Sequence, residues 1–115
     1  MRYEVQENCL TIFLPNELDH HNAEEIRRKA DRLIEKHHIK CVIFDFAETN
    51  FMDSSGIGLI LGRYKRVNKM SGKIYISGCR RHLEKVLEMA DIFSLIPKYD
   101  NYQDVFQCDL EVTNG

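Results

Sequence analysis

The sequence predicts an α/β layered domain in which a mixed sheet of about four to five strands packs against about four α-helices. Short stretches with a two-residue repeat alternate along the chain with longer stretches whose apolar residues recur at helical spacing. The run CVIFDF at residues 41–46 is almost entirely apolar, which is typical of a strand covered on both faces. Since the 115 residues contain no linker, repeat or low-complexity tract, we expect residues 1–115 to form a single domain.

Two strands open the predicted fold. An alternating stretch begins at residues 3–5, and a turn is expected at residues 7–8. Strand periodicity resumes over residues 9–14 until Pro15 and Asn16 end it, because these residues favour a turn.

A helix follows, with Asn22 as its predicted N-cap. Glu25 stands three residues later, as in a capping box. The stretch ends near His37 and His38. Its apolar side chains share one face at helical spacing: Ala23, Ile26, Ala30, Leu33 and Ile34.

The second helix is predicted within NFMDSSGIGLILGRYK, residues 50–65, and beyond it. Gly58 and Gly62 lie four residues apart on one face, which predicts a close approach to a neighbouring element. A C-terminal cap is expected at Ser71-Gly72. The apolar positions that fit this helix are Ile57, Ile60, Leu61, Tyr64 and Val67.

The remaining chain predicts a strand, a helix, an edge strand and a last helix. The strand is 73–77, and Leu83, Val86, Leu87 and Ala90 mark the third helix. Pro97 confines the strand at 95–99 to a sheet edge. Asp100 or Asn101 caps the last helix, and the residues from about 109 are expected to fray.

Composition excludes several classes of function. The net charge of -2 and the dispersed basic residues predict neither a nucleic-acid surface nor a polybasic membrane patch. The N-terminal MRYEVQE lacks the apolar core of a signal peptide, and no apolar run is long enough to cross a bilayer. Four cysteines, Cys9, Cys41, Cys79 and Cys108, form no C-x-x-C pair, which favours reduced thiols in a cytoplasmic protein without a metal site.

Most charged residues are expected on solvated faces. This expectation covers Asp31 and the basic run 27–29 on the first helix. Arg63, Lys65 and Arg66 are expected on the exterior of the second helix, from which they could meet an acidic partner.

The segment Asp53-Ser54-Ser55-Gly56 is the main candidate site, because it lies where a buried strand passes into a helix. One explanation is N-capping, which Ser and Asp favour and which is worth about 1 kcal/mol. The other is a modified or nucleophilic serine. Neither the G-x-S-x-G elbow nor the G-x-x-x-x-G-K-[ST] phosphate loop occurs here.

A phosphate on Ser54 is physically reasonable, because a helix N-terminus tolerates an anion. At a partner's surface the effect is larger. Two like charges about 5 Å apart cost roughly 3 kcal/mol at an effective dielectric constant near 20. The phosphate would therefore switch binding without refolding the domain.

The segment ELDHH at residues 17–21 is the second candidate, between the second strand and the first helix. It is most simply a polar loop with an acidic helix start. A hydrolytic triad of Asp19, His20 and Ser54 can be written, but no oxyanion motif supports it.

Two segments, NELDHHNAEEIR and VIFDFAETNFMDSSGIGLILGRYK, resemble the anti-sigma factor antagonists of the STAS domain family. The resemblance spans nearly the whole chain and is strongest to the sporulation type, which acts on the forespore sigma factor (sigma F). Asn16 departs from the family pattern, which commonly has glycine there, and CRRH at 79–82 is less typical.

The resemblance implies a single STAS domain and a binding function without enzymatic activity. The unphosphorylated antagonist binds the anti-sigma factor, an ATP-dependent serine kinase, and so releases the sigma factor. The kinase then phosphorylates the first serine of the motif, here Ser54, and a serine phosphatase restores the active form. The residues that the resemblance places at the partner interface are Asp19, Asp53, Ser55, Ile57 and Val86.

The resemblance also implies no catalytic residue, no cofactor and no direct contact with nucleic acid or membrane. The nucleotide belongs to the kinase, and the chain alone is expected to be a cytoplasmic monomer. Two alternatives stay open: a STAS module of another stress-response sigma pathway, and a STAS domain that binds a nucleotide or another small ligand.

Overall fold

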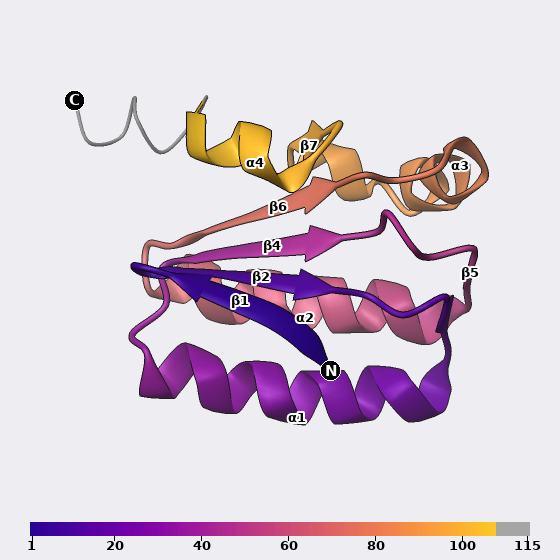
Figure 1. Cartoon of the computed structure of the whole chain (residues 1–115). Helices are drawn as coiled ribbons and strands as arrows, with labels where there is room; N and C mark the ends of the chain where they lie inside the picture. Colours follow the sequence, from indigo (N-terminus) through magenta and orange to yellow (C-terminus); the bar gives the residue numbers. More distant parts are fainter. Residues whose placement is uncertain (108–115) are drawn as a thin grey trace.

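A five-stranded mixed sheet forms the centre of the computed structural model, which describes residues 1–107. The strands lie in the order β1-β2-β4-β6-β7 (Figure 1). β1 runs antiparallel to β2, and all other neighbouring pairs in this sheet are parallel. The strands are β1 (Arg2–Gln6), β2 (Cys9–Phe13), β4 (Cys41–Asp45), β6 (Lys73–Ser77) and β7 (Lys98–Tyr99). The predicted mixed α/β sheet is confirmed, whereas the fraying expected from about residue 109 lies outside the described residues.

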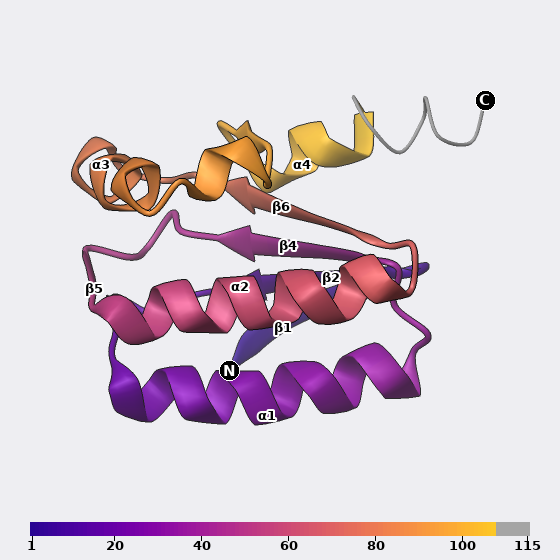
Figure 2. The ribbon, with the colours of Figure 1, turned by 180° about the vertical axis from the view of Figure 1, so that it is seen from behind.

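Four α-helices and one 3₁₀ turn complete the described fold. Figure 2 shows α2 in front of the sheet with α1 beside it, and α3 and α4 lie beyond β6. None of the helices in residues 1–107 combines the length and apolarity that a membrane crossing requires. The helices are α1 (His20–Lys36), α2 (Ser54–Lys69), α3 (Arg81–Met89) and α4 (Tyr102–Val105), with the 3₁₀ turn at Ile92–Ser94.

The sheet separates two apolar clusters, because successive side chains of a strand point to opposite faces. The larger cluster lies between the sheet and the α1, α2 and α3 helices and includes Leu10, Val42 and Ile74. The smaller cluster on the opposite face includes Ile43 and Tyr75, with Val105 of α4 packed over them. Every residue of β4 is buried, which explains its nearly continuous apolar sequence.

Two very short strands were not predicted. β3 (Glu17–Leu18) and β5 (Phe51–Met52) pair in parallel, with Leu18 opposite Met52. Strands of two residues leave no periodicity in a sequence, so only the folded chain reveals them. Their pairing holds the loops after β2 and β4 together.

The predicted start of α1 is wrong by three residues. The N-cap is Asp19, whose side chain accepts a hydrogen bond from the Asn22 N–H at 3.0 Å. The Asn22 side chain in turn accepts from the Asp19 N–H at 2.8 Å, so Asn22 completes a capping box instead of starting the helix. The predicted apolar face of α1 is confirmed, since all five of its residues are buried.

The glycine prediction for α2 is also wrong. A Cβ added at Gly58 or Gly62 would meet nothing within 4 Å, so neither glycine permits a close approach. The crowded position is Gly56, where a Cβ would collide with the side chains of Met52 and Leu18. The close approach is therefore between the first turn of α2 and the β3–β5 pair.

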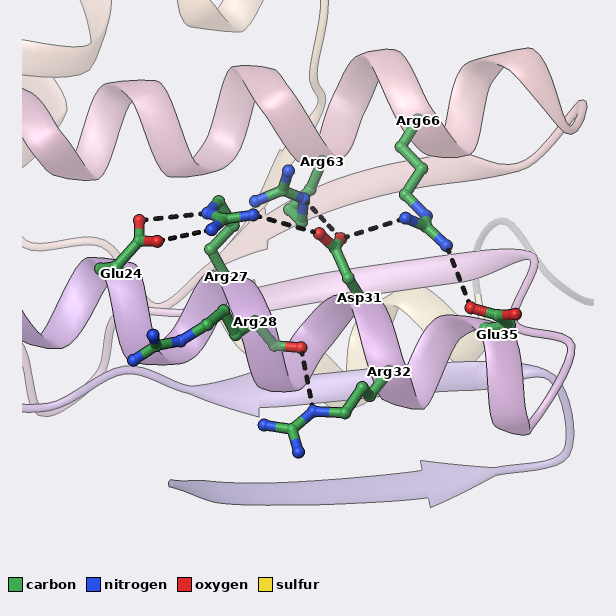
Figure 3. Close-up of polar contacts among 8 residues, drawn as sticks. All are labelled: Glu24, Arg27, Arg28, Asp31, Arg32, Glu35, Arg63 and Arg66. Carbon is green, nitrogen blue, oxygen red and sulfur yellow. Dashed lines mark hydrogen bonds and ion pairs between the residues drawn. The ribbon is translucent and has the colours of Figure 1, made fainter.

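An ionic network joins α1 to α2, and its centre is Asp31 (Figure 3). The Arg63 Nε lies 3.0 Å from the Asp31 carboxylate, and the Arg63 side chain is only 10% exposed. Arg27 and Arg66 approach the same carboxylate at 3.7 and 3.8 Å. The expectation that Arg63 is solvated is wrong, because helix packing buries it, and Asp31 is half-buried beside it.

Because Arg63 is buried, its positive charge needs the Asp31 carboxylate as a partner. Desolvation lowers the pKa of the Arg63 guanidinium, while the negative charge of Asp31 raises it. An arginine stays protonated in a protein, so the buried charge needs its partner. The pair therefore fixes how α2 lies along α1, and with it the position of the first turn of α2.

Removal of this partner is expected to destabilise the domain. Asp31→Ala should lower the free energy of unfolding by about 2–3 kcal/mol, because it leaves the Arg63 charge buried without compensation. Glu35→Ala is the matched control, since the Glu35 side chain is 83% exposed and pairs with Arg66 at 4.0 Å; it should change stability by less than about 0.5 kcal/mol. Urea unfolding measures the free energy of unfolding of both variants. Equal losses of this free energy would contradict the role of Asp31.

Candidate functional site

Two helix N-termini lie side by side at one end of the sheet. α1 and α2 begin at the same end of the molecule, directly after β3 and β5 (Figure 2). The Asp53 N–H donates to the Leu18 carbonyl at 3.1 Å, which continues the β3–β5 pairing up to the start of α2. The carboxyl ends of β2 and β4 thus lead into one shared surface, where open α/β sheets place their ligands.

Asp53 is the N-cap of α2. Its backbone is extended, and its side chain accepts a hydrogen bond from the Ser55 N–H at 2.8 Å. The Asp53 carbonyl accepts from the Gly56 N–H at 3.0 Å. Asp53 therefore provides the N-cap, and capping does not explain the two serine hydroxyls.

The two serines differ in exposure. Ser54 is the first residue of α2 and is exposed, whereas Ser55 is half-buried. Among residues 1–107, neither hydroxyl takes part in a hydrogen bond. Ser54 therefore presents a free hydroxyl to any protein that approaches this end of the molecule.

A small hollow of about 160 Å³ opens beside the site, between α1 and α2. Ser55 and Gly58 line it from α2, and His20 and Arg27 line it from α1. The hollow is too small for a nucleotide, since ligand pockets usually measure about 300–1,000 Å³. It is a shallow surface feature next to Ser54.

The hydrolytic triad does not assemble in the described part of the chain. The Asp19 carboxylate accepts from the Asn22 N–H, and no hydrogen bond there joins His20 to Asp19 or to Ser54. The His20 ring lies instead 5.9 Å from the His21 ring. No group of three or more metal-ligating side chains occurs in the same residues.

The predicted contact residues on α2 and α3 lie near this end of the fold. Ile57 is partly buried in the first turns of α2 and packs against the core. Val86 lies on α3 and is 39% exposed. The His82 Nε2 donates to the Asn50 carbonyl at 2.6 Å, which ties α3 to the loop that leads into the site.

Phe51 is an exposed apolar residue that was not predicted from the sequence. Its side chain is 52% exposed in β5, two residues before Asp53. Its neighbour Met52 is buried, so the two residues alternate as in a strand with one solvated face. That alternation was the only available signal, and two residues are too few to read it.

A larger hollow of about 560 Å³ lies elsewhere, beyond the carboxyl ends of β6 and β7. Its charged lining contains more acids than bases, which disfavours the phosphates of a nucleotide. The charged residues are Arg80, Lys98, Glu84, Asp100 and Asp104. Lys98 is also bound to Glu84 at 2.7 Å, which leaves less positive charge for a ligand.

The sequence profile of the STAS domain matches residues 1–105. The anti-sigma F factor antagonist of Paenibacillus polymyxa is 34% identical over 98 residues, covering 85% of this chain and 84% of that relative. The anti-sigma F factor antagonist of Lysinibacillus sphaericus is 32% identical over 88 residues, covering 76% and 75%. An anti-sigma-B factor antagonist of Listeria monocytogenes is 24% identical over 87 residues, also covering 76% and 75%.

Two solved structures of one protein resemble this fold along nearly its whole length. The anti-sigma factor antagonist SpoIIAA in its unphosphorylated form matches with a TM-score of 0.76 at 28% identity, covering 99% of this chain and 97% of that one. The Bacillus cell fate determinant SpoIIAA in the phosphorylated form matches with a TM-score of 0.75 at 28% identity, covering 92% and 96%.

Alanine substitutions at Gly56 and Gly58 are expected to change the stability of the domain in opposite directions. Gly56→Ala should destabilise the domain by about 1–3 kcal/mol, because its Cβ would collide with Met52 and Leu18. Gly58→Ala should stabilise it by about 0.5–1 kcal/mol, since its Cβ meets open space in a helix. Thermal unfolding followed by circular dichroism measures both, and a Gly56→Ala variant as stable as the parent would contradict the described packing.

Proposed function

This chain belongs to the STAS domain family, and we propose that it is an anti-sigma factor antagonist of the sporulation, or sigma F, type, switched off by phosphorylation of Ser54. In the proposed cycle, the unphosphorylated protein binds an anti-sigma factor that is also an ATP-dependent serine kinase. The sigma factor is thereby released. The kinase phosphorylates Ser54 and dissociates, and a serine phosphatase removes the phosphate. The protein acts in the cytoplasm as a monomer, and Ser54 is a substrate without catalytic activity of its own.

The observation that carries this proposal is the free, exposed hydroxyl of Ser54 at the start of α2. A kinase needs an accessible hydroxyl, and Asp53 already performs the capping that the serine would otherwise provide. The similarity to the sigma F antagonists supports an anti-sigma F factor as the binding partner. The similarity to SpoIIAA, which has been solved in a phosphorylated form, supports phosphorylation of Ser54.

A phosphate on Ser54 would act mainly on the partner. It adds a charge of about -1.5 to -2 next to a helix N-terminus, which favours it, and next to the Asp53 carboxylate, which opposes it. The two effects offset each other within the domain, so the fold is retained. A partner surface packed on Ser54 has no such compensation, and it loses affinity when the charge appears.

The proposed contact surface surrounds Ser54. Asp19 and Asp53 are only half-buried although both cap helices, so their outer oxygen atoms can meet donors of the kinase. The first turns of α2 add Ser55 and Ile57, and Val86 supplies an apolar contact from α3.

The two alternative functions receive less support. A sigma B type pathway is disfavoured by the lower identity of the Listeria relative, 24% against 34% and 32% for the sigma F relatives. A nucleotide-binding role is disfavoured by the small hollow at Ser55 and the acidic lining of the larger one. Calorimetry with ATP and GTP in the absence of the kinase separates this second alternative from the proposal.

Phosphorylation is expected at one residue. Incubation with the cognate anti-sigma kinase and ATP should add one phosphate, and peptide mass spectrometry should place it on Ser54. Ser54→Ala should abolish the modification, while Ser55→Ala should retain it, because only the Ser54 side chain is exposed. A phosphate on Ser55 alone would overturn the site assignment.

Charge rather than side-chain size is expected to control binding. Ser54→Asp should weaken affinity for the anti-sigma factor by about tenfold to a hundredfold, because it places one negative charge at the interface. Ser54→Asn has nearly the same shape as Ser54→Asp without the charge and should lose less than about threefold. Calorimetric titration measures both, with circular dichroism as the check on folding. Equal losses of affinity for the two variants would show that the anti-sigma factor responds to side-chain size and not to charge.

A further inference from the structure

Two cysteines occupy matching positions at the amino ends of β2 and β4. Cys9 and Cys41 are the first residues of these adjacent parallel strands and are partners in the sheet register. Register partners in a parallel pair point to the same face, with backbones about 4.8 Å apart. Their Sγ atoms lie 2.6 Å apart. A disulfide requires Cα atoms about 4.4–6.8 Å apart, so the backbone already has the required spacing.

The pair lies in the smaller apolar cluster, on the face of the sheet opposite α1 and α2. Cys9 is 1% exposed and Cys41 is 3% exposed. Val105 of α4 is buried in the same cluster, and the flanking aromatic residues Tyr102 and Phe106 pack against it. The last helix of the described chain therefore packs into the same apolar cluster as the two sulfur atoms.

The α4 helix in this cluster is short. It spans Tyr102–Val105, and the Asn101 side chain caps it by accepting from the Asp104 N–H at 3.2 Å. Short elements with few contacts open locally at a much lower free energy than the whole domain. Opening of α4 would expose the two thiols while the sheet stays folded.

We propose that Cys9 and Cys41 form a redox site, which closes to an intramolecular disulfide by exchange with a small disulfide of the glutathione type when α4 opens. One cysteine thiolate attacks the oxidant, forming a mixed disulfide and releasing one thiol. The second cysteine thiolate then attacks the protein sulfur of that mixed disulfide and releases the second thiol. Both protein thiols lose their protons and are oxidised, and one disulfide is reduced to two thiols.

Burial and the contact between the two sulfur atoms keep the pair unreactive while α4 is closed. The hydrogen bond from the Cys9 thiol to Cys41, together with burial, raises the pKa of Cys9 far above its usual range. Since the thiolate is the reactive species, the buried pair reacts slowly. Cys79 lies outside the cluster and has no neighbouring sulfur among residues 1–107, so it has no partner for a disulfide there.

The redox site lies far from the phosphorylation site. Cys9 and Cys41 begin their strands, whereas the loops to Ser54 follow the carboxyl ends, roughly 13 Å further along the sheet. Oxidation should therefore leave the phosphorylation of Ser54 unchanged. The redox proposal and the proposed antagonist function can fail independently.

The first test is oxidation of the full chain with oxidised glutathione, followed by non-reducing peptide mapping. The expected product links Cys9 to Cys41 with the loss of two free thiols, and Cys79→Ser should give the same link. Exclusive formation of glutathione adducts, a link that uses Cys79 or Cys108, or a fully reduced 9–41 pair after equilibration would each overturn the proposal.

The second test compares two buried valines. Val105→Ala weakens the packing of α4, and Val67→Ala truncates a valine of the same burial in the other cluster. Oxidation of Val105→Ala should be on the order of tenfold faster than that of Val67→Ala, after correction for their global stabilities. Equal rates would show that global unfolding exposes the pair, which would overturn the role of α4.

Discussion

The parallel pairing of β3 with β5 is the constraint on which the candidate site depends. Each strand has only two residues, yet their pairing and the hydrogen bond from the Asp53 N–H to the Leu18 carbonyl hold two helix starts side by side. Gly56 lets the first turn of α2 pack directly on this pair. The ion pair between half-buried Asp31 and buried Arg63 then fixes the same helix further along its length. Ser54 is therefore presented on a rigid support.

Neighbouring side chains at the site have different roles in this arrangement. Asp19 and Asp53 satisfy the two helix N-termini, so each carboxylate has a structural partner. The Ser54 hydroxyl has none within the described residues and faces solvent. A group that the fold does not need can gain or lose a phosphate at little cost to stability. This property suits a protein whose two forms must share one fold while a partner distinguishes them.

The regular elements could be predicted from the sequence because their periodicity is long enough to read. The apolar face of α1 and the fully buried β4 both follow from residue spacing alone. The two-residue strands could not be predicted, because two residues show no periodicity. The Asp31–Arg63 pair could not be predicted either, because its burial depends on two helices distant in sequence. Ser54 was singled out by its place at a strand-to-helix junction and by family resemblance. The exposure of Phe51 became visible only in the folded chain.

We expect a phosphate on Ser54 to change the surface of the domain without changing its fold. Hydrogen exchange of the phosphorylated and unphosphorylated chains, followed by mass spectrometry, distinguishes the two effects. Protection should be identical in β2, β4 and β6, with differences confined to residues 17–22 and 50–58. Loss of protection across the central strands would contradict this expectation, because the phosphate would then act by unfolding the domain.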